Sequence, residues 1–74
     1  MTVYELCKEE ACDQLCAIRK DGEIIEFVWG GFEDVSRLYD SLGNAEVKEA
    51  TFSALQILDR DGNKYKVPCL FIDI

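Results

Sequence analysis

The most regular hydrophobic pattern in the chain runs from Phe32 to Leu42. Its apolar side chains recur at the i, i+3, i+4 and i+7 spacing of one helical face, namely Val35, Leu38, Tyr39 and Leu42. Glu33 and Asp34 would lie in the first turn, where the helix dipole favours negative charge. The pair Gly43-Asn44 that follows is a conventional left-handed stop. We therefore predict an amphipathic helix over residues 32–42.

A second, shorter helix is predicted at the N-terminus. Thr2 and Glu5 have the spacing of a capping box, and the apolar residues that follow them could form one helical face. We predict a helix over residues 3–12 that packs this face on the rest of the chain, because an isolated helix of this length would be marginal. If residues 2–6 formed a strand instead, the chain could adopt a β-grasp-like sheet.

Two strands are predicted on either side of Asp21-Gly22, over residues 15–20 and 23–29. Both segments are rich in β-branched and aromatic residues, and Asp-Gly between such segments is a strong hairpin signal because a type I′ turn needs positive φ at both central residues. Alternation in the second strand would place one group on a common face, namely Ile25, Phe27 and Trp29.

A second hairpin is predicted from residues 46–58 and 64–74, with its turn at Asp61-Gly62. The first arm does not alternate cleanly, which indicates a bulge or a break near Ser53-Ala54. The second arm is apolar on both faces, as in a strand buried on two sides. Pro68 cannot donate to a ladder, so we expect it at an edge or at the start of the strand.

This element order, α-β-β-α-β-β, indicates an α+β fold. We expect one small two-layer domain over residues 1–74: a mostly antiparallel sheet from two hairpins, with the helix over 32–42 packed on one face. The 74 residues allow a single core. No apolar run approaches the roughly 20 residues that span a bilayer. The N-terminus lacks the basic start of a secretory signal, so a cytoplasmic location is expected, with no membrane partner.

The chain is acidic: fifteen Asp and Glu oppose eight Lys and Arg, giving a net charge of −7. Direct nucleic-acid binding is not expected, because phosphate contacts need clustered Lys and Arg. An acidic surface could instead dock on a basic protein surface. A charge of about 2 to 8 in magnitude also simply keeps a small domain soluble. Charge alone leaves both interpretations open.

The four cysteines could in principle form a zinc site: Cys7, Cys12, Cys16 and Cys69. Structural zinc usually takes ligands from two close pairs, whereas here the fourth cysteine stands alone and histidine is absent. Disulfides are disfavoured in a reducing cytosol. We therefore expect small buried hydrophobes. Without a histidine to activate a thiol, a cysteine nucleophile is not expected either.

The segment from Asp59 to Asn63 resembles the start of a calcium loop. Counted from Asp59, however, the glycine falls at position 4 and Leu70 at position 12, where an EF-hand has glycine at 6 and glutamate at 12. We therefore interpret the segment as a hairpin turn. No other cluster of residues completes a catalytic mechanism. We expect no metal, no cofactor and no enzymatic activity.

The aromatic residues divide into core and surface candidates. Trp29, Tyr39 and Phe52 are expected in the core of so small a domain, whereas Tyr4 and Tyr65 are better interface candidates. The speculative interface combines these two tyrosines with acidic residues, namely Glu5, Glu9, Glu10, Asp13, Glu33 and Asp34.

Two short ends, residues 1–6 (MTVYEL) and 71–74 (FIDI), resemble small uncharacterised acidic proteins of phages and mobile elements of Gram-positive bacteria. The resemblance brings no catalytic residues. It implies a context in which short acidic proteins bind and block host machinery, including restriction and CRISPR effectors.

We therefore expect a small non-catalytic protein-binding module that inhibits a host defence or nucleic-acid-handling protein, in the manner of an anti-CRISPR protein. The partner would be a host or phage protein, with a basic surface if the acidic residues guide association. The alternative is a homodimeric structural or regulatory protein that associates through an unpaired sheet edge.

Overall fold

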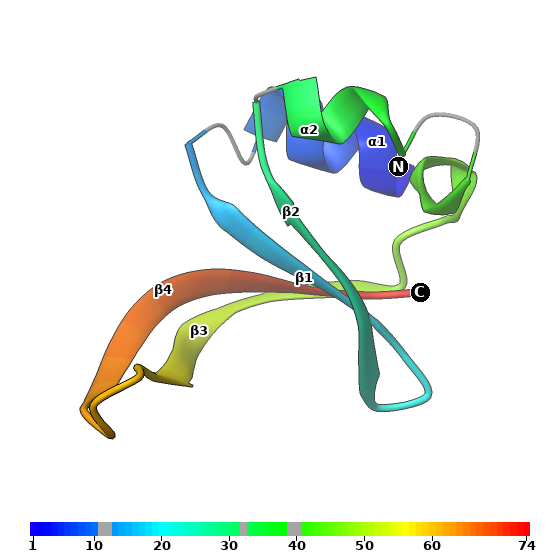
Figure 1. The fold of residues 1–74 in the computed structure, drawn as a ribbon. Coiled ribbons are helices and arrows are strands. Elements are labelled where there is room, and N and C mark those ends of the chain that lie inside the picture. The colour runs from blue at the N-terminus through cyan, green and yellow to red at the C-terminus, as the bar shows by residue number, and fades with distance from the viewer. Residues whose placement is uncertain (11–12, 32, 39–40) are drawn as a thin grey trace.

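The computed structural model describes residues 1–10, 13–31, 33–38 and 41–74, and it shows an α+β fold with a four-stranded mixed sheet (Figure 1). The elements in chain order are α1 (Val3–Glu5), the π-helical turn η1 (Leu6–Glu10), β1 (Leu15–Lys20), β2 (Glu23–Trp29), α2 (Glu33–Ser36), the 3-10 turn η2 (Leu42–Asn44), β3 (Glu49–Leu58) and β4 (Lys64–Asp73).

The N-terminal helix begins with the predicted capping box. The Thr2 hydroxyl accepts from the Glu5 N–H at 3.3 Å, and the Glu5 carboxylate accepts from the Thr2 N–H at 3.0 Å. The helix starts as α-helix and continues as π-helix from Leu6, so the strand alternative for residues 2–6 is wrong. Thr2 makes an isolated bridge with Glu46. Residues 11 and 12, the end of the predicted helix, lie outside the described residues.

The helix predicted over residues 32–42 is much shorter. It runs from Glu33 to Ser36, and the Leu38 carbonyl then accepts from the N–H groups of Ser41 at 3.0 Å and Gly43 at 2.7 Å. The chain thus folds back on itself instead of continuing the helix. Phe32, Tyr39 and Asp40 lie outside the described residues.

Gly43 is not a left-handed stop, because it lies within η2 and is absent from the glycines with positive φ. The residue is small for another reason. An added Cβ would lie 2.4 Å from the Leu38 carbonyl oxygen, closer than side-chain carbons approach backbone atoms. Close backbone contact, rather than backbone conformation, therefore requires glycine here.

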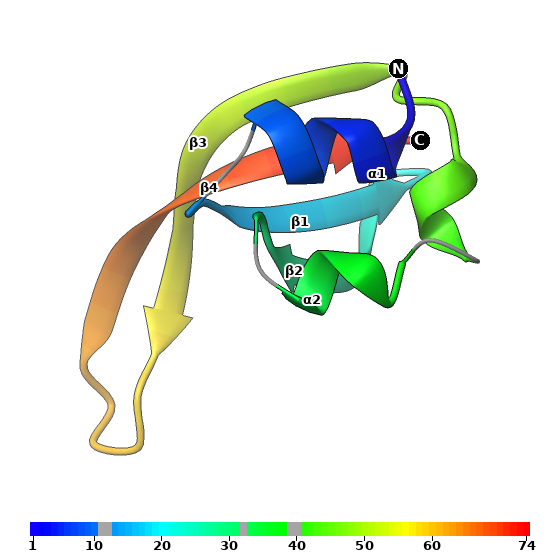
Figure 2. The ribbon, with the colours of Figure 1, turned by 90° about the horizontal axis from the view of Figure 1, so that it is seen from above.

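The sheet has the strand order β2-β1-β4-β3 (Figure 2). Both predicted hairpins form, with β1 antiparallel to β2 and β3 antiparallel to β4. They join through a parallel pairing of β1 with β4, from Cys16↔Leu70 to Arg19↔Asp73, so the sheet is mixed. The parallel pairing unites strands that lie at opposite ends of the sequence.

The two hairpin turns differ. At Asp21-Gly22 both central residues have positive φ, 54° and 84°, as the type I′ prediction requires. In the second hairpin the Asp59 N–H donates to the Asn63 carbonyl at 3.0 Å and Gly62 has φ 82°, the pattern of a three-residue loop with a left-handed glycine.

The bulge or break predicted near Ser53-Ala54 is wrong. The register of β3 with β4 is continuous, and the irregularity falls instead in the first hairpin, between Ile18 and Arg19. The alternation of β3 fails for a different reason: nearly every residue of the strand is exposed, so neither face is held to an apolar pattern.

Pro68 lies inside β4 opposite Ala54, at a local edge of the sheet. The pairing of β4 with β1 begins two residues later, at Leu70, so the missing N–H of the proline interrupts no ladder. The side-chain amide of Gln14 donates to the Pro68 carbonyl at 3.0 Å, so this carbonyl has a hydrogen-bond partner although β1 does not pair with β4 here.

The core lies between the sheet and the helices and contains aliphatic residues and cysteines. Its buried members are Val3, Leu6, Cys7, Cys16, Ile18, Val28, Val35, Leu38, Leu70 and Ile72. Cys7, Cys16 and Cys69 are buried free thiols, as expected of small hydrophobes. The expectation that Trp29 and Phe52 fill the core is wrong, because they are 41% and 63% exposed. In the described ranges, no helix is long and apolar enough to cross a membrane.

Candidate functional site

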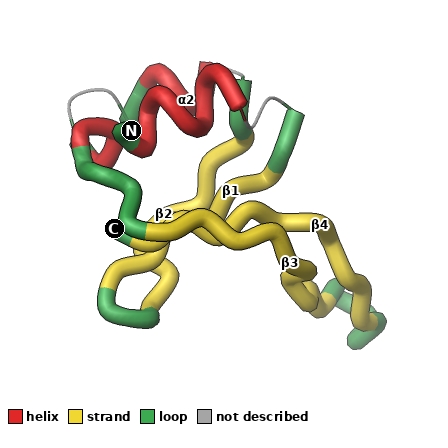
Figure 3. The backbone as a smooth tube through the Cα atoms, turned by 180° about the vertical axis from the view of Figure 1, so that it is seen from behind, coloured by secondary structure: helices red, strands yellow, loops and turns green. Residues whose placement is uncertain are grey.

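One face of the sheet has no helix against it in the described parts of the chain (Figures 1 and 3). Partner residues on neighbouring strands point to the same face, and core members Cys16, Ile18 and Ile72 identify the helix-covered one. The opposite side, here called the open face, therefore consists of Ile24, Phe27 and Trp29 from β2, Leu15, Ala17 and Arg19 from β1, Tyr65, Val67, Cys69, Phe71 and Asp73 from β4, and Glu49, Thr51, Ser53, Leu55 and Ile57 from β3.

The open face exposes large apolar side chains: Ile24, Phe27, Trp29, Ile57 and Tyr65 are each between 37% and 49% exposed. Phe27 and Trp29 are neighbours on one face of β2, whereas Ile57 and Tyr65 pair near the tip of the second hairpin. The exposed apolar side chains thus form separate groups along one face, and exposed aromatic side chains are common anchors of interfaces. The face is therefore the strongest binding candidate among the described residues.

A bidentate ion pair crosses the same face. Arg19 donates through Nε and Nη2 to the two carboxylate oxygens of Asp73, at 2.8 and 3.0 Å. Its guanidinium also stacks over the Phe71 ring, 4.7 Å from the ring centroid. The hydrogen bonds that Arg19 donates to Asp73 raise the pKa of Arg19. Arg19 and Asp73 are held in place and largely use each other's hydrogen-bonding groups.

The tip of the second hairpin is organised by Asp59. Its carboxylate accepts from the N–H groups of Asp61 at 2.8 Å and Asn63 at 2.9 Å, and from the hydroxyl of Tyr65. The bond from Tyr65 is the main cause that lowers the pKa of Asp59, and the same bond raises the pKa of Tyr65. The oxygens of Asp59 thus shape the turn, in line with the hairpin interpretation of this segment.

The thiols of Cys7 and Cys16 meet beneath the helices. The side-chain hydrogen bond between them lowers the pKa of Cys7 and raises that of Cys16. Cys69 belongs to the open face by register, and burial raises the pKa of its thiol. Cys12 lies outside the described residues, and within the described ones no three His, Cys, Asp or Glu side chains are close enough together to hold a metal ion.

The residues predicted for an interface do not gather at one place. Glu5 and Glu9 are exposed on α1 and η1, and Asp13, with φ 58°, is exposed just before β1. Tyr4 is half-buried against the core with the Lys8 ammonium over its ring, whereas Tyr65 belongs to the open face. The side chains of Glu10, Glu33 and Asp34 lie outside the described part.

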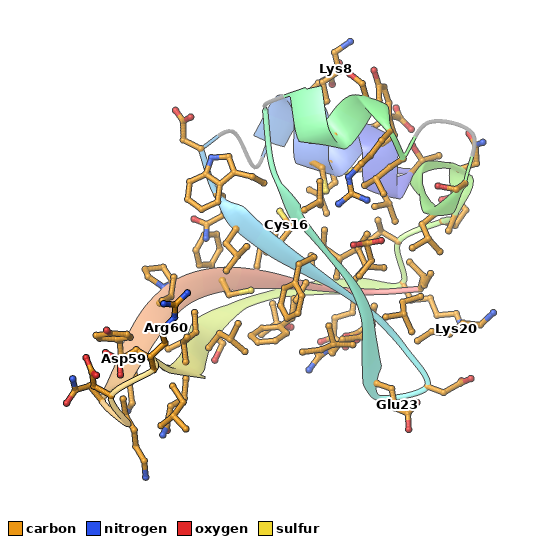
Figure 4. All side chains as sticks on the ribbon, viewed as in Figure 1. Lys8, Cys16, Lys20, Glu23, Asp59 and Arg60 are labelled. Atoms are coloured by element: carbon orange, nitrogen blue, oxygen red, sulfur yellow. The ribbon has the colours of Figure 1, made fainter. Side chains whose placement is uncertain are left out.

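Charged side chains also mark the extremities of the molecule. Lys20 and Glu23 lie at the tip of the first hairpin, Asp59 and Arg60 at the tip of the second, and Lys8 on the helical layer (Figure 4). The apolar open face thus lies between charged ends.

The alternation of residues 23–29 was the signal for part of this face in the sequence, but it does not reveal which side the helices cover. Ile25, predicted on the same face, falls at the bulge of the first hairpin.

No protein-family model, no curated protein and no solved structure matches this chain.

Proposed function

We propose that this chain is a small non-catalytic protein-binding module whose binding surface is the open face of the sheet. The observation that carries the proposal is the exposure of Ile24, Phe27, Trp29, Ile57 and Tyr65 on one face. Tryptophan and tyrosine are among the residue types that dominate binding energy at interfaces. The helices pack on the other face over its core residues Cys16, Ile18 and Ile72, which leaves the open face available to a partner.

The ordered ion pair of Arg19 and Asp73 suits such a surface. Its side chains are about 30% exposed and already positioned by the Phe71 ring and by each other. A partner would therefore lose little side-chain entropy by packing over them. The apolar patch would supply affinity, and the ion pair would favour partner groups that complement its two charges.

The acidic residues have a separate role in this proposal. Glu5 and Glu9 extend from the helical layer, away from the open face, so they would guide a partner with basic regions at long range. The partner class, a host defence or nucleic-acid-handling protein in the cytoplasm that the chain inhibits, is supported by the resemblance of residues 1–6 and 71–74 alone.

The test is capture from a host lysate, followed by measurement of affinity for the identified partner. Phe27→Ser should weaken binding by about 2 kcal/mol, roughly 30-fold, because it removes an aromatic anchor. Phe52→Ser is the matched control: it removes the same side chain from the opposite face of the sheet and should leave affinity within about twofold. Circular dichroism checks that both variants stay folded.

Equal loss of affinity in both variants, or none in either, would contradict the open face as the binding surface. Titration at low and high salt examines the acidic residues separately. If the association rate does not fall as salt rises, Glu5 and Glu9 do not guide the encounter.

A further inference from the structure

We propose that the free edge of β3 binds a second copy of this chain, and that the two β3 strands pair antiparallel about a two-fold axis at Ala54. This edge is a different surface from the open face, and its role goes beyond the proposed function.

The outer strand β3 pairs with β4 on one side, and no strand of the described residues lies on its other side. All of its residues except Leu55 are exposed. From Ala50 to Leu58 it contains no charged residue and no proline, and its register has no bulge. Soluble proteins normally protect a long edge strand with one of these devices.

The other outer strand, β2, has such protection. The Phe27 N–H donates to the Glu26 carboxylate at 3.1 Å, and the Phe27 carbonyl accepts from Arg37 Nη2 at 3.0 Å. Glu26 and Arg37 also form an ion pair at 3.4 Å. The two side chains thus occupy backbone groups that another strand would need, and the bulge opposite Ile18 and Arg19 distorts the same strand.

The backbone groups that β3 presents follow from its register. Asp59 donates to Asn63 at 3.0 Å, and hydrogen-bonded pairs alternate with non-hydrogen-bonded ones along an antiparallel ladder. Counting back from Asp59, the odd-numbered residues face β4. The N–H and C=O groups that point to solvent belong to Ala50, Phe52, Ala54, Gln56 and Leu58. The position of Pro68 opposite Ala54 agrees, because a proline fits a non-hydrogen-bonded pair.

A second β3 strand can satisfy all of these groups. With Ala54 opposite its own copy, Phe52 pairs with Gln56 and Ala50 with Leu58, and each outward N–H meets an outward C=O. The two-fold axis stands perpendicular to the sheet, so side chains that meet across it lie on matching faces. One sheet then runs through both copies, and their open faces lie on the same side.

Charge favours a second copy at this strand. Each chain carries a net charge of −7, so most contacts between copies would oppose like charges. The stretch from Ala50 to Leu58 is uncharged, so these residues of the two copies meet without opposing charges. The first like-charged pairs of this register, Glu49 with Asp59 and Lys48 with Arg60 of the copy, lie beyond the two ends of the uncharged stretch.

Sedimentation equilibrium of the full chain tests the proposal. The wild type should sediment at twice its mass of 8.4 kDa. Ala54→Pro should raise the dimer dissociation constant roughly 10- to 100-fold, because it removes an outward N–H that no bond within the chain uses. A lysine on the protected edge strand β2, Ile25→Lys, should leave the dimer intact. It is the control for a lysine on β3, Ala54→Lys, which is described next.

The register has its own test, which does not depend on proline being tolerated. Ala54→Lys and Ala54→Asp should each be monomeric, because like charges meet at the axis, and their equimolar mixture should form a heterodimer. A wild-type monomer at every concentration would overturn the proposal. A dimer whose dissociation constant the Ala54 variants leave unchanged would also overturn it. The same holds if the Ala54 variants keep the dimer and lose only the binding of a strand from another protein.

Discussion

The two outer strands of the sheet, β2 and β3, meet solvent in opposite ways. Glu26 and Arg37 occupy the backbone of β2 at Phe27, and the segment that carries Arg37 follows directly from the helix α2. β3 belongs to a hairpin that extends away from the helices, and no described helix lies beside its outer edge (Figure 2). An outer strand is therefore protected here where a side chain from the segment after α2 contacts its backbone, as Arg37 does at β2.

The largest expected effect is the loss of stability when a core residue on the central strand β1 is truncated, compared with a residue on the outer strand β3. Ile18, on the central strand β1, is fully buried, so Ile18→Ala should lower the free energy of unfolding by about 2–5 kcal/mol. Phe52→Ala on the bare edge strand should cost about 1 kcal/mol or less. Urea denaturation measures both. A similar cost at the two positions would show that the second hairpin is as tightly packed as the first, and the contrast would fail.

Removal of the protection on β2 should have a smaller effect. Arg37→Ala deletes the bond to the Phe27 carbonyl and the ion pair with Glu26, and should lower stability by about 0.5–1.5 kcal/mol. It should also increase self-association through β2, measured by light scattering in an Ala54→Pro background. Arg60→Ala, which removes a cation from the far hairpin tip, is the control. If both variants scatter light equally, Arg37 does not protect the edge.

The smallest effect concerns the tip of the bare hairpin at low pH. Bonds from Tyr65, Asn63 and Asp61 lower the pKa of Asp59 below its usual 3.8. A folded pKa below the unfolded one means that this stabilisation is present above about pH 4 and lost as the pH falls through the folded value. Asp59→Asn should therefore show a smaller fall in melting temperature between pH 6 and pH 2 than the wild type. An equal fall would show that Asp59 contributes nothing to the acid sensitivity.

Much of the local structure could be predicted from the sequence because short-range chemistry decides it. The Thr2–Glu5 capping box, the Asp21-Gly22 turn and the two hairpins depend on residues close together in the chain. The failures have tertiary causes. The helix after Glu33 ends early because the chain closes on the Leu38 carbonyl, and β3 loses its alternation because neither of its faces is buried.

The candidate site was less predictable than the fold. Alternation in residues 23–29 places Phe27 and Trp29 together, yet no local signal shows that the helices cover the opposite face. That outcome depends on the parallel pairing of β1 with β4, which joins residues more than fifty positions apart.

The sequence by itself determined the acidic composition, the turns, the helix start and the two hairpins, because each depends on local residue chemistry. The tertiary structure alone decided which sheet face is open, which edge is protected and where Pro68 finds a tolerated place. These features arise from the assembly of distant segments, and hydrophobic burial acts on the whole sheet rather than on any one segment.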